Sequence, residues 1–129
     1  MQNLKIFKEL KKLSSILFFV LISLSVFAQR KNDIIQQRIE FIAEDLELED
    51  ISLEDVFDVL YYYYDNRINL NTATSDDLHE LLLLSDFQIN ELLARIRQQG
   101  YFESVYQLQE MDNWDLMTID LVLPFIVVI

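Results

Sequence analysis

Three short motifs in the second half of the chain predict where helices begin. In Thr74–Asp77, Ser85–Gln88 and Ser104–Gln107, a hydroxyl residue stands three positions before an acid or an amide. The hydroxyl can accept a hydrogen bond from an amide of the first helical turn, while the later side chain reaches back to the capping residue. The helix after Ser85 is expected to end at Gly100, because a helix C-terminus favours a residue that tolerates positive φ. Each motif therefore marks the N-terminus of a helix.

The upstream segment carries two more helical patterns. Residues 32–49 place apolar residues four, three and four positions apart, and residues 52–64 keep the same periodicity without a gap. The chain has one glycine, one proline and no cysteine among 129 residues, so few residues interrupt a helix and no disulfide forms. We therefore predict an all-α fold. The apolar positions are Ile35, Ile39, Ile42 and Leu46 in the first segment and Leu53, Val56, Phe57, Leu60, Tyr61 and Tyr64 in the second.

Two stretches of these segments allow two interpretations each. The acidic "EDLELED" at residues 44–50 is either a solvated helix end, which is preferred, or a calcium site that lacks the Asp-x-Asp-x-Asp-Gly order of a calcium loop. "YYYY" at residues 61–64 is either a stacking platform for sugars or bases, or a set of side chains that lie in the core and at its exposed rim (core plus rim). Core plus rim is preferred, because Tyr61 and Tyr64 lie on the apolar stripe. Tyr62 and Tyr63 are then left to face outward or toward a partner.

The first 28 residues are typical of a secretory signal peptide. Four lysines in "MQNLKIFKELKK" precede an uncharged, mostly apolar run over residues 13–28, which ends with small residues at Val26 and Ala28. We expect cleavage after Ala28; the alternative is an uncleaved anchor, since the run is at the lower limit of a membrane span. Cleavage removes four lysines and one glutamate, so the net charge of −12 becomes −15. Such a charge repels nucleic acid and anionic lipid at long range.

Residues 68–129 combine several short fragments in a fixed order. "INLNTAT" precedes the first helix, "RQQGYF" follows the second, "LQEM" precedes a second corner, and "LPFI" closes the segment. In this order the fragments resemble the tandem helix-hairpin-helix module of competence-type (ComEA-like) DNA-uptake proteins. With the upstream segment, the chain looks like the N-terminal part of larger exported helix-hairpin-helix proteins of diderm bacteria. After the signal peptide (1–28), the resemblance implies a two-helix lead-in (29–67) and a tandem helix-hairpin-helix domain (68–129), located in the periplasm or at the outer membrane.

The resemblance also identifies candidate contact residues. In the family, a Gly-x-Gly turn between the helices of each hairpin brings backbone amides to a DNA phosphate. Here neither turn contains glycine, and Asp86, Asp112 and Asp115 bring negative charge to the same places. The hairpin positions implied by the resemblance are Leu83, Leu84 and Ser85 in the first turn and Asn113, Trp114 and Asp115 in the second.

These features favour an exported interaction or scaffold module without catalytic activity. Tyrosines of the second helix, Trp114 and the apolar C-terminus suit contacts with a protein partner or with a downstream region of the same chain. The alternative is a DNA-binding module of a ComEA-like uptake system, which the charge and the turns disfavour. An enzyme is not expected, because the single histidine has no second imidazole or thiol for a partner. We expect no metal and no cofactor.

The C-terminal residues complete the expected fold. The last helix should hold Leu116, Ile119 and Leu123, end at Pro124, and pass into an extended "FIVVI". An uncovered apolar strand is unusual, so either the native chain continues past Ile129 or this strand pairs elsewhere. One core should join the two hairpins through Leu78, Leu81, Leu92, Leu93, Ile96, Leu108, Ile119 and Leu123.

Overall fold

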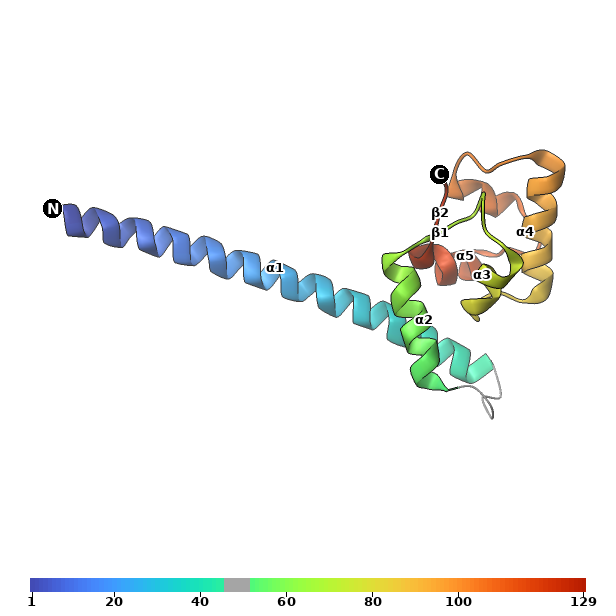
Figure 1. Ribbon diagram of the computed structural model, residues 1–129, viewed down its shortest axis with the longest axis horizontal. Coiled ribbons are helices and arrows are strands. Elements are labelled where there is room, and N and C mark those ends of the chain that lie inside the picture. The colour runs from blue at the N-terminus through green and yellow to red at the C-terminus, as the bar shows by residue number, and fades with distance from the viewer. Residues whose placement is uncertain (46–51) are drawn as a thin grey trace. The chain divides into compact units, whose positions relative to one another are not determined.

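The computed structural model describes residues 1–45 and 52–129 (Figure 1). It divides into two compact units, residues 1–34 and residues 35–129, and helix α1 (Gln2–Asp45) belongs to both. Every residue from 1 to 30 is exposed. Within the described residues, α1 is the one helix long and apolar enough to cross a membrane, a property that a signal sequence shares.

The unit of residues 35–129 is built almost entirely of short helices, which confirms the predicted all-α class. After the end of α1 come α2 (Leu53–Asp65), α3 (Ser75–Glu80), α4 (Asp86–Gln99), the 3-10 helix η1 (Val105–Glu110), α5 (Leu116–Val122) and the 3-10 turn η2 (Leu123–Phe125). Two strands of two residues each, β1 (Ile68–Asn69) and β2 (Ile126–Val127), complete the described elements.

All three predicted capping boxes are present. The hydroxyls of Thr74 and Ser85 each accept a hydrogen bond from the amide three residues later, and Asp77 and Gln88 bond back to the capping amide. Ser104 begins η1 in the same reciprocal way with Gln107. Gly100 follows α4 with φ of 88°, a conformation that costs glycine nothing. The motifs therefore predicted these helix ends correctly.

The apolar C-terminal residues find their partner within the chain. β2 pairs in parallel with β1, so that Ile68 is opposite Ile126 and Asn69 is opposite Val127. Two asparagines of the "INLN" segment hold this edge together. Asn69 Oδ1 accepts a hydrogen bond from the Ile129 amide at 3.2 Å, and Asn71 Nδ2 donates to the Ile129 carbonyl at 3.2 Å. The expected pairing of "FIVVI" with another segment is therefore present, with β1 as the partner.

One hydrophobic core joins the end of α1 to all the later helices. Ile35, Ile42, Val56 and Leu60 of the upstream helices are buried together with five residues of the expected core, and Leu93 and Ile96 are partly buried against them. The five are Leu78, Leu81, Leu92, Leu108 and Ile119. The predicted face of the last helix is wrong in part, because Leu116 and Leu123 are 72% and 43% exposed. Leu123 leaves the expected face because the chain changes there to a 3-10 turn, which alters the rotation per residue, and Leu116 is the first residue of this short helix. The core residues that α5 and η2 supply are Ile119, Leu121, Val122 and Phe125.

Arg38 is a buried charged residue that the apolar pattern did not reveal. Its side chain is buried in α1 between Ile35 and Ile42, and it donates to the last carbonyls of α5. Nη2 lies 2.8 Å from the Asp120 carbonyl, and Nε lies 3.2 Å from the Leu121 carbonyl. An arginine at a helix C-terminus satisfies carbonyls that have no partner inside the helix. Arg38 therefore fixes α5 to the end of α1.

Candidate functional site: the pocket between the two turns

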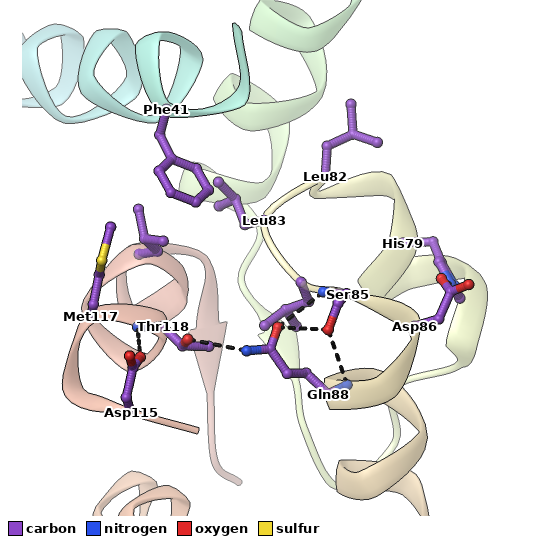
Figure 2. Close-up of a pocket in the computed structure, with 12 residues that line it drawn as sticks. Phe41, His79, Leu82, Leu83, Ser85, Asp86, Gln88, Asp115, Met117 and Thr118 are labelled. Atoms are coloured by element: carbon purple, nitrogen blue, oxygen red, sulfur yellow. Dashed lines mark hydrogen bonds and ion pairs between the residues drawn. The ribbon is translucent and has the colours of Figure 1, made fainter. Parts of the chain in front are cut away.

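A pocket of about 560 Å³ lies between two helix–turn–helix corners (Figure 2). We call residues 81–85, between α3 and α4, the first turn, and residues 111–115, between η1 and α5, the second turn. The pocket is bounded by the first turn, by the N-termini of α4 and α5, and by Phe41 of α1. The residues that line it are Phe41, His79, Leu82, Leu83, Leu84, Ser85, Asp86, Gln88, Asp115, Met117, Thr118 and Leu121.

The first turn is built from leucines and contains a backbone conformation that leucine rarely adopts. Leu82 has φ of 56°, and in the described residues no other non-glycine residue has a positive φ. Its amide donates to the His79 carbonyl at 3.0 Å, which closes the end of α3. Sequence reasoning missed Leu82. A sharp corner between helices commonly needs one residue with a positive φ, which is usually glycine. Because this turn has no glycine, the sequence did indicate that another residue must adopt that conformation.

In the second turn, a carboxylate of α4 binds the backbone amides. Glu91 Oε1 accepts from the Asp112 amide at 3.0 Å, and Oε2 accepts from the Asn113 amide at 3.3 Å. Consecutive amides that converge on one anion are the arrangement used to bind phosphate. Here the anion comes from the protein itself. Glu91 is a second residue that the sequence did not single out, because its partners are backbone groups about 20 residues away.

Gln88 connects the two corners. Its Oε1 accepts from the Ser85 amide at 3.0 Å, while its Nε2 donates to the Asn113 carbonyl at 3.0 Å and to Thr118 Oγ1 at 3.1 Å. Gln88 and Thr118 are both the third residue of their helices, so the two helix N-termini meet through these side chains (Figure 2). The capping box at Ser85 thus also holds the second turn in place.

The six candidate contact residues fall into two groups. Leu83, Leu84 and Trp114 are buried, and the Trp114 indole donates to the Gln88 carbonyl at 3.2 Å. Trp114 is therefore part of the core and does not offer an exposed aromatic surface, contrary to the expectation from the sequence. Ser85, Asn113 and Asp115 are exposed, and Ser85 and Asp115 are the N-caps of α4 and α5.

Exposed apolar residues lie in the first turns of the same two helices. Phe87 is the second residue of α4 and is 66% exposed, and Met117 is the second residue of α5 and is 60% exposed. Leu116 beside Met117 is 72% exposed. A large apolar side chain gains nothing next to a phosphate, whereas it gains free energy when a partner protein covers it.

Two titratable groups at the rim of the pocket have shifted pKa values. The hydrogen bond from the Thr118 amide, 2.7 Å long, holds the pKa of Asp115 below its usual value. His79 Nε2 lies 2.8 Å from Asp86 Oδ1, and Nδ1 lies 2.7 Å from the Ser75 carbonyl. The contact with Asp86, followed by that with the Ser75 carbonyl, raises the pKa of His79. Since both acceptors need a donor, this geometry fits a doubly protonated imidazolium.

Of the four tyrosines at 61–64, three pack against the core. Tyr61 and Tyr64 do so as expected, and Tyr63 joins them, because it is partly buried and donates a 2.6 Å hydrogen bond to Glu80. That hydrogen bond raises the pKa of the Tyr63 phenol. Only Tyr62 of the four is mostly exposed, at 60%. The structure therefore favours the interpretation of core plus rim over a stacking platform.

Among the described residues, no group of three or more His, Cys, Asp or Glu side chains is placed to hold a metal ion. In "EDLELED", residues 46–50, with three of its five carboxylates, lie outside the described residues, and the calcium alternative depends on them. The hydroxyls of Ser85 and Ser104 accept hydrogen bonds from backbone amides as helix caps. What the pocket offers chemically is apolar surface together with carboxylates.

Comparison of the chain with protein-family models, with curated proteins and with solved structures gives no match.

Proposed function

We propose that this chain is an exported, non-catalytic protein that uses a tandem helix-hairpin-helix unit as an interaction and scaffold module. Two helix–turn–helix corners, joined through equivalent residues Gln88 and Thr118, support the helix-hairpin-helix assignment. The observation that carries the functional part is the Glu91 carboxylate on the amides of the second turn. Asn113 is one of the hairpin positions at which the resembled family would bring an amide to a phosphate, and here an acidic side chain of the same chain accepts from that amide and from its neighbour at Asp112.

The first turn supports the same conclusion. Ser85 and Gln88 already satisfy amides at the N-terminus of α4, so its positive end has partners within the protein. Leu83 and Leu84 are buried, and Asp86 adds a carboxylate whose side chain is 85% exposed. The exposed Asp86 carboxylate would repel a phosphate at this turn.

Export is supported by how burial is distributed along the chain. Residues 1–30 are all exposed, whereas the core begins at Ile35. Cleavage after Ala28 would therefore remove no core residue and would leave the part of α1 that holds Ile35, Arg38 and Ile42. The signal peptide proposed from the basic head and the apolar run is compatible with the fold of the remaining chain.

DNA binding, as in ComEA-like uptake proteins, is the second candidate function. Its support is the resemblance together with the placement of two helix N-termini beside one pocket. Binding to a duplex depends mainly on neutralising phosphates with lysine or arginine, and neither residue type lines the pocket.

A duplex-binding measurement tests the proposal. Residues 29–129 retain the whole described core and should give no saturable anisotropy change with a labelled DNA duplex, even at about 50 mM salt, where phosphate contacts are strongest. Micromolar binding that weakens steeply with added salt would instead establish the DNA-binding function.

A pair of matched variants tests the role of Glu91. Glu91→Ala exposes the amides of Asp112 and Asn113, whereas Glu103→Ala removes the same charge from an exposed position that caps no amide in the second turn. We expect Glu91→Ala to lower the free energy of unfolding by about 1–3 kcal/mol and still not to bind the duplex. Duplex binding gained by Glu91→Ala alone would show that the turn keeps a functional phosphate site.

A further inference from the structure

The pocket between the two turns has an apolar surface drawn from three parts of the fold. Phe41 comes from the end of α1, Leu82 from the first turn and Met117 from α5, and Figure 2 shows Phe41 and Met117 on the same side of the pocket. Leu83, Leu84 and Leu121 line the pocket as well and belong to the buried residues. A volume of about 560 Å³ is within the range of protein binding pockets, and it exceeds the volume of one large side chain.

The backbone at Leu82 gives a second, independent observation. A left-handed conformation costs a residue with a Cβ about 1–2 kcal/mol, and glycine would avoid this cost. The leucine that bears this cost lines the pocket. Strained backbone residues concentrate at binding sites, where the surrounding structure fixes them in one conformation. We take the strain as a sign that the leucine side chain is used.

The rim of the pocket is acidic. Asp86 and Asp115 line it and are exposed, and the lowered pKa of Asp115 keeps that carboxylate ionised at neutral pH. The charged partner of Asp86 is His79, which also lines the pocket and is 45% exposed in its side chain. No lysine or arginine is among the lining residues. The pocket is therefore complementary to a cation that is attached to an apolar group.

The geometry points to this pocket as the docking site for a partner-protein segment that carries a bulky apolar side chain beside a lysine or arginine. The apolar side chain would enter between Phe41, Leu82 and Met117, and the cation would meet Asp115, because Asp86 already pairs with the His79 imidazolium. A second copy of this chain is a poor occupant, because it would bring a net charge of the same sign, −12, to an acidic rim. The inference rests on the proposed interaction function and assigns it a surface and a partner chemistry.

Three labelled peptides of equal length test the inference against residues 29–129. One alternates leucine with lysine, one replaces each leucine by serine, and one replaces each lysine by glutamate. By fluorescence anisotropy we expect saturable binding of the leucine–lysine peptide, at least about tenfold weaker binding of the serine–lysine peptide and none of the leucine–glutamate peptide. Equal affinity for the serine–lysine peptide would mean that charge alone is recognised and would overturn the proposal.

Variants of the lining residues test whether the leucine–lysine peptide binds in the pocket. Met117→Ser removes apolar surface, and Asp115→Asn removes charge while asparagine keeps the helix cap. Each should weaken the leucine–lysine peptide by about tenfold. Tyr106→Ser and Asp58→Asn change exposed residues outside the pocket lining and should leave the affinity within about twofold of wild type. Equal losses in the pocket variants and in these controls would overturn the proposal.

The duplex measurement distinguishes an error in the docking site from an error in the proposed interaction function. If neither the leucine–lysine peptide nor the duplex binds, the docking site is wrong and the interaction module still stands. If the duplex binds with micromolar affinity, the interaction module itself is wrong.

Discussion

His79 is the only histidine of the chain, so its imidazole can be followed without interference. Its folded-state pKa is raised above the ordinary value of 6.5, chiefly by Asp86. The stability that this pair contributes is therefore complete below about pH 6.5 and is lost as the pH rises through the raised folded-state pKa. Asp76 is the further charged group that acts on the ring, in the same direction.

An NMR titration of the His79 ring protons tests this coupling. In the Asp86→Asn variant we expect the pKa of His79 to fall toward its ordinary value, because the variant removes the acceptor charge. Asp112→Asn is the matched control, since Asp112 is an exposed acid of the other turn. A pKa of His79 that is the same in wild type and Asp86→Asn would contradict the contact between Nε2 and Oδ1.

The positive φ of Leu82 predicts that glycine is tolerated at this position. Leu82→Gly relieves a left-handed conformation worth about 1–2 kcal/mol, which offsets the added chain entropy and the loss of a partly buried side chain. We expect its free energy of unfolding to lie within about 1 kcal/mol of wild type in urea titrations. Leu83→Gly empties a buried position and should cost more than about 2 kcal/mol. Equal losses at both positions would argue against the positive φ.

Among the elements, the contact between α1 and α5 depends on Arg38. Arg38→Met keeps an apolar stem but removes the donors to the Asp120 and Leu121 carbonyls. We expect a loss of about 2–3 kcal/mol in the free energy of unfolding, because charged donors make strong hydrogen bonds and buried carbonyls lose their partner. The ion pair with Asp120 adds little, since that side chain is 77% exposed.

Arg67→Met is the control for this loss, because Arg67 is exposed and the substitution removes the same charge. Its free energy of unfolding should stay within about 0.5 kcal/mol of the wild-type value. Similar melts for the two variants would mean that α5 is held by its apolar residues alone.

The elements also show what the sequence could predict. Helix starts were predictable because a capping box is local chemistry, complete within four residues, as at Ser85. The phase of α5 was not, because the change to a 3-10 turn at Leu123 depends on the packing of Phe125 in the core. Long α helices keep their phase by repetition, whereas seven residues give too few repeats to fix it.

The pocket was less predictable than the helices. The resemblance suggested contact residues in the first turn, where the pocket lies, but three of the six expected contact residues are buried. Glu91 and Arg38 escaped notice because each bonds to backbone groups of a distant segment, and a backbone carbonyl or amide leaves no mark in the sequence. The side chains that were found are the helix caps, whose backbone partners lie within the same helical turn, so that the spacing of the motif fixes them.

For the molecule as a whole, the proposed processing is directly measurable. We expect the mature protein recovered from the cell envelope to begin at Gln29, because Val26 and Ala28 supply the small residues of a cleavage site. Mass spectrometry of the intact protein determines its first residue. Ala28→Arg should block cleavage and leave the precursor mass, while Asn32→Ala, beyond the site, should not. A mature mass that retains residues 1–28 would establish a membrane anchor in place of a signal peptide.

The parallel pairing of β1 with β2 has a consequence for biogenesis. Ile68 pairs with Ile126, so this contact cannot form while the ribosome still holds residues 126–127. Phe125 and Ile126 are fully or almost fully buried, so the core stays incomplete until the same moment. A nascent chain whose closing contacts are so distant in sequence folds late. For the export proposed above, this late closure would keep residues 68–125 unfolded, and so competent for passage through a translocon, until residues 126–127 have been made.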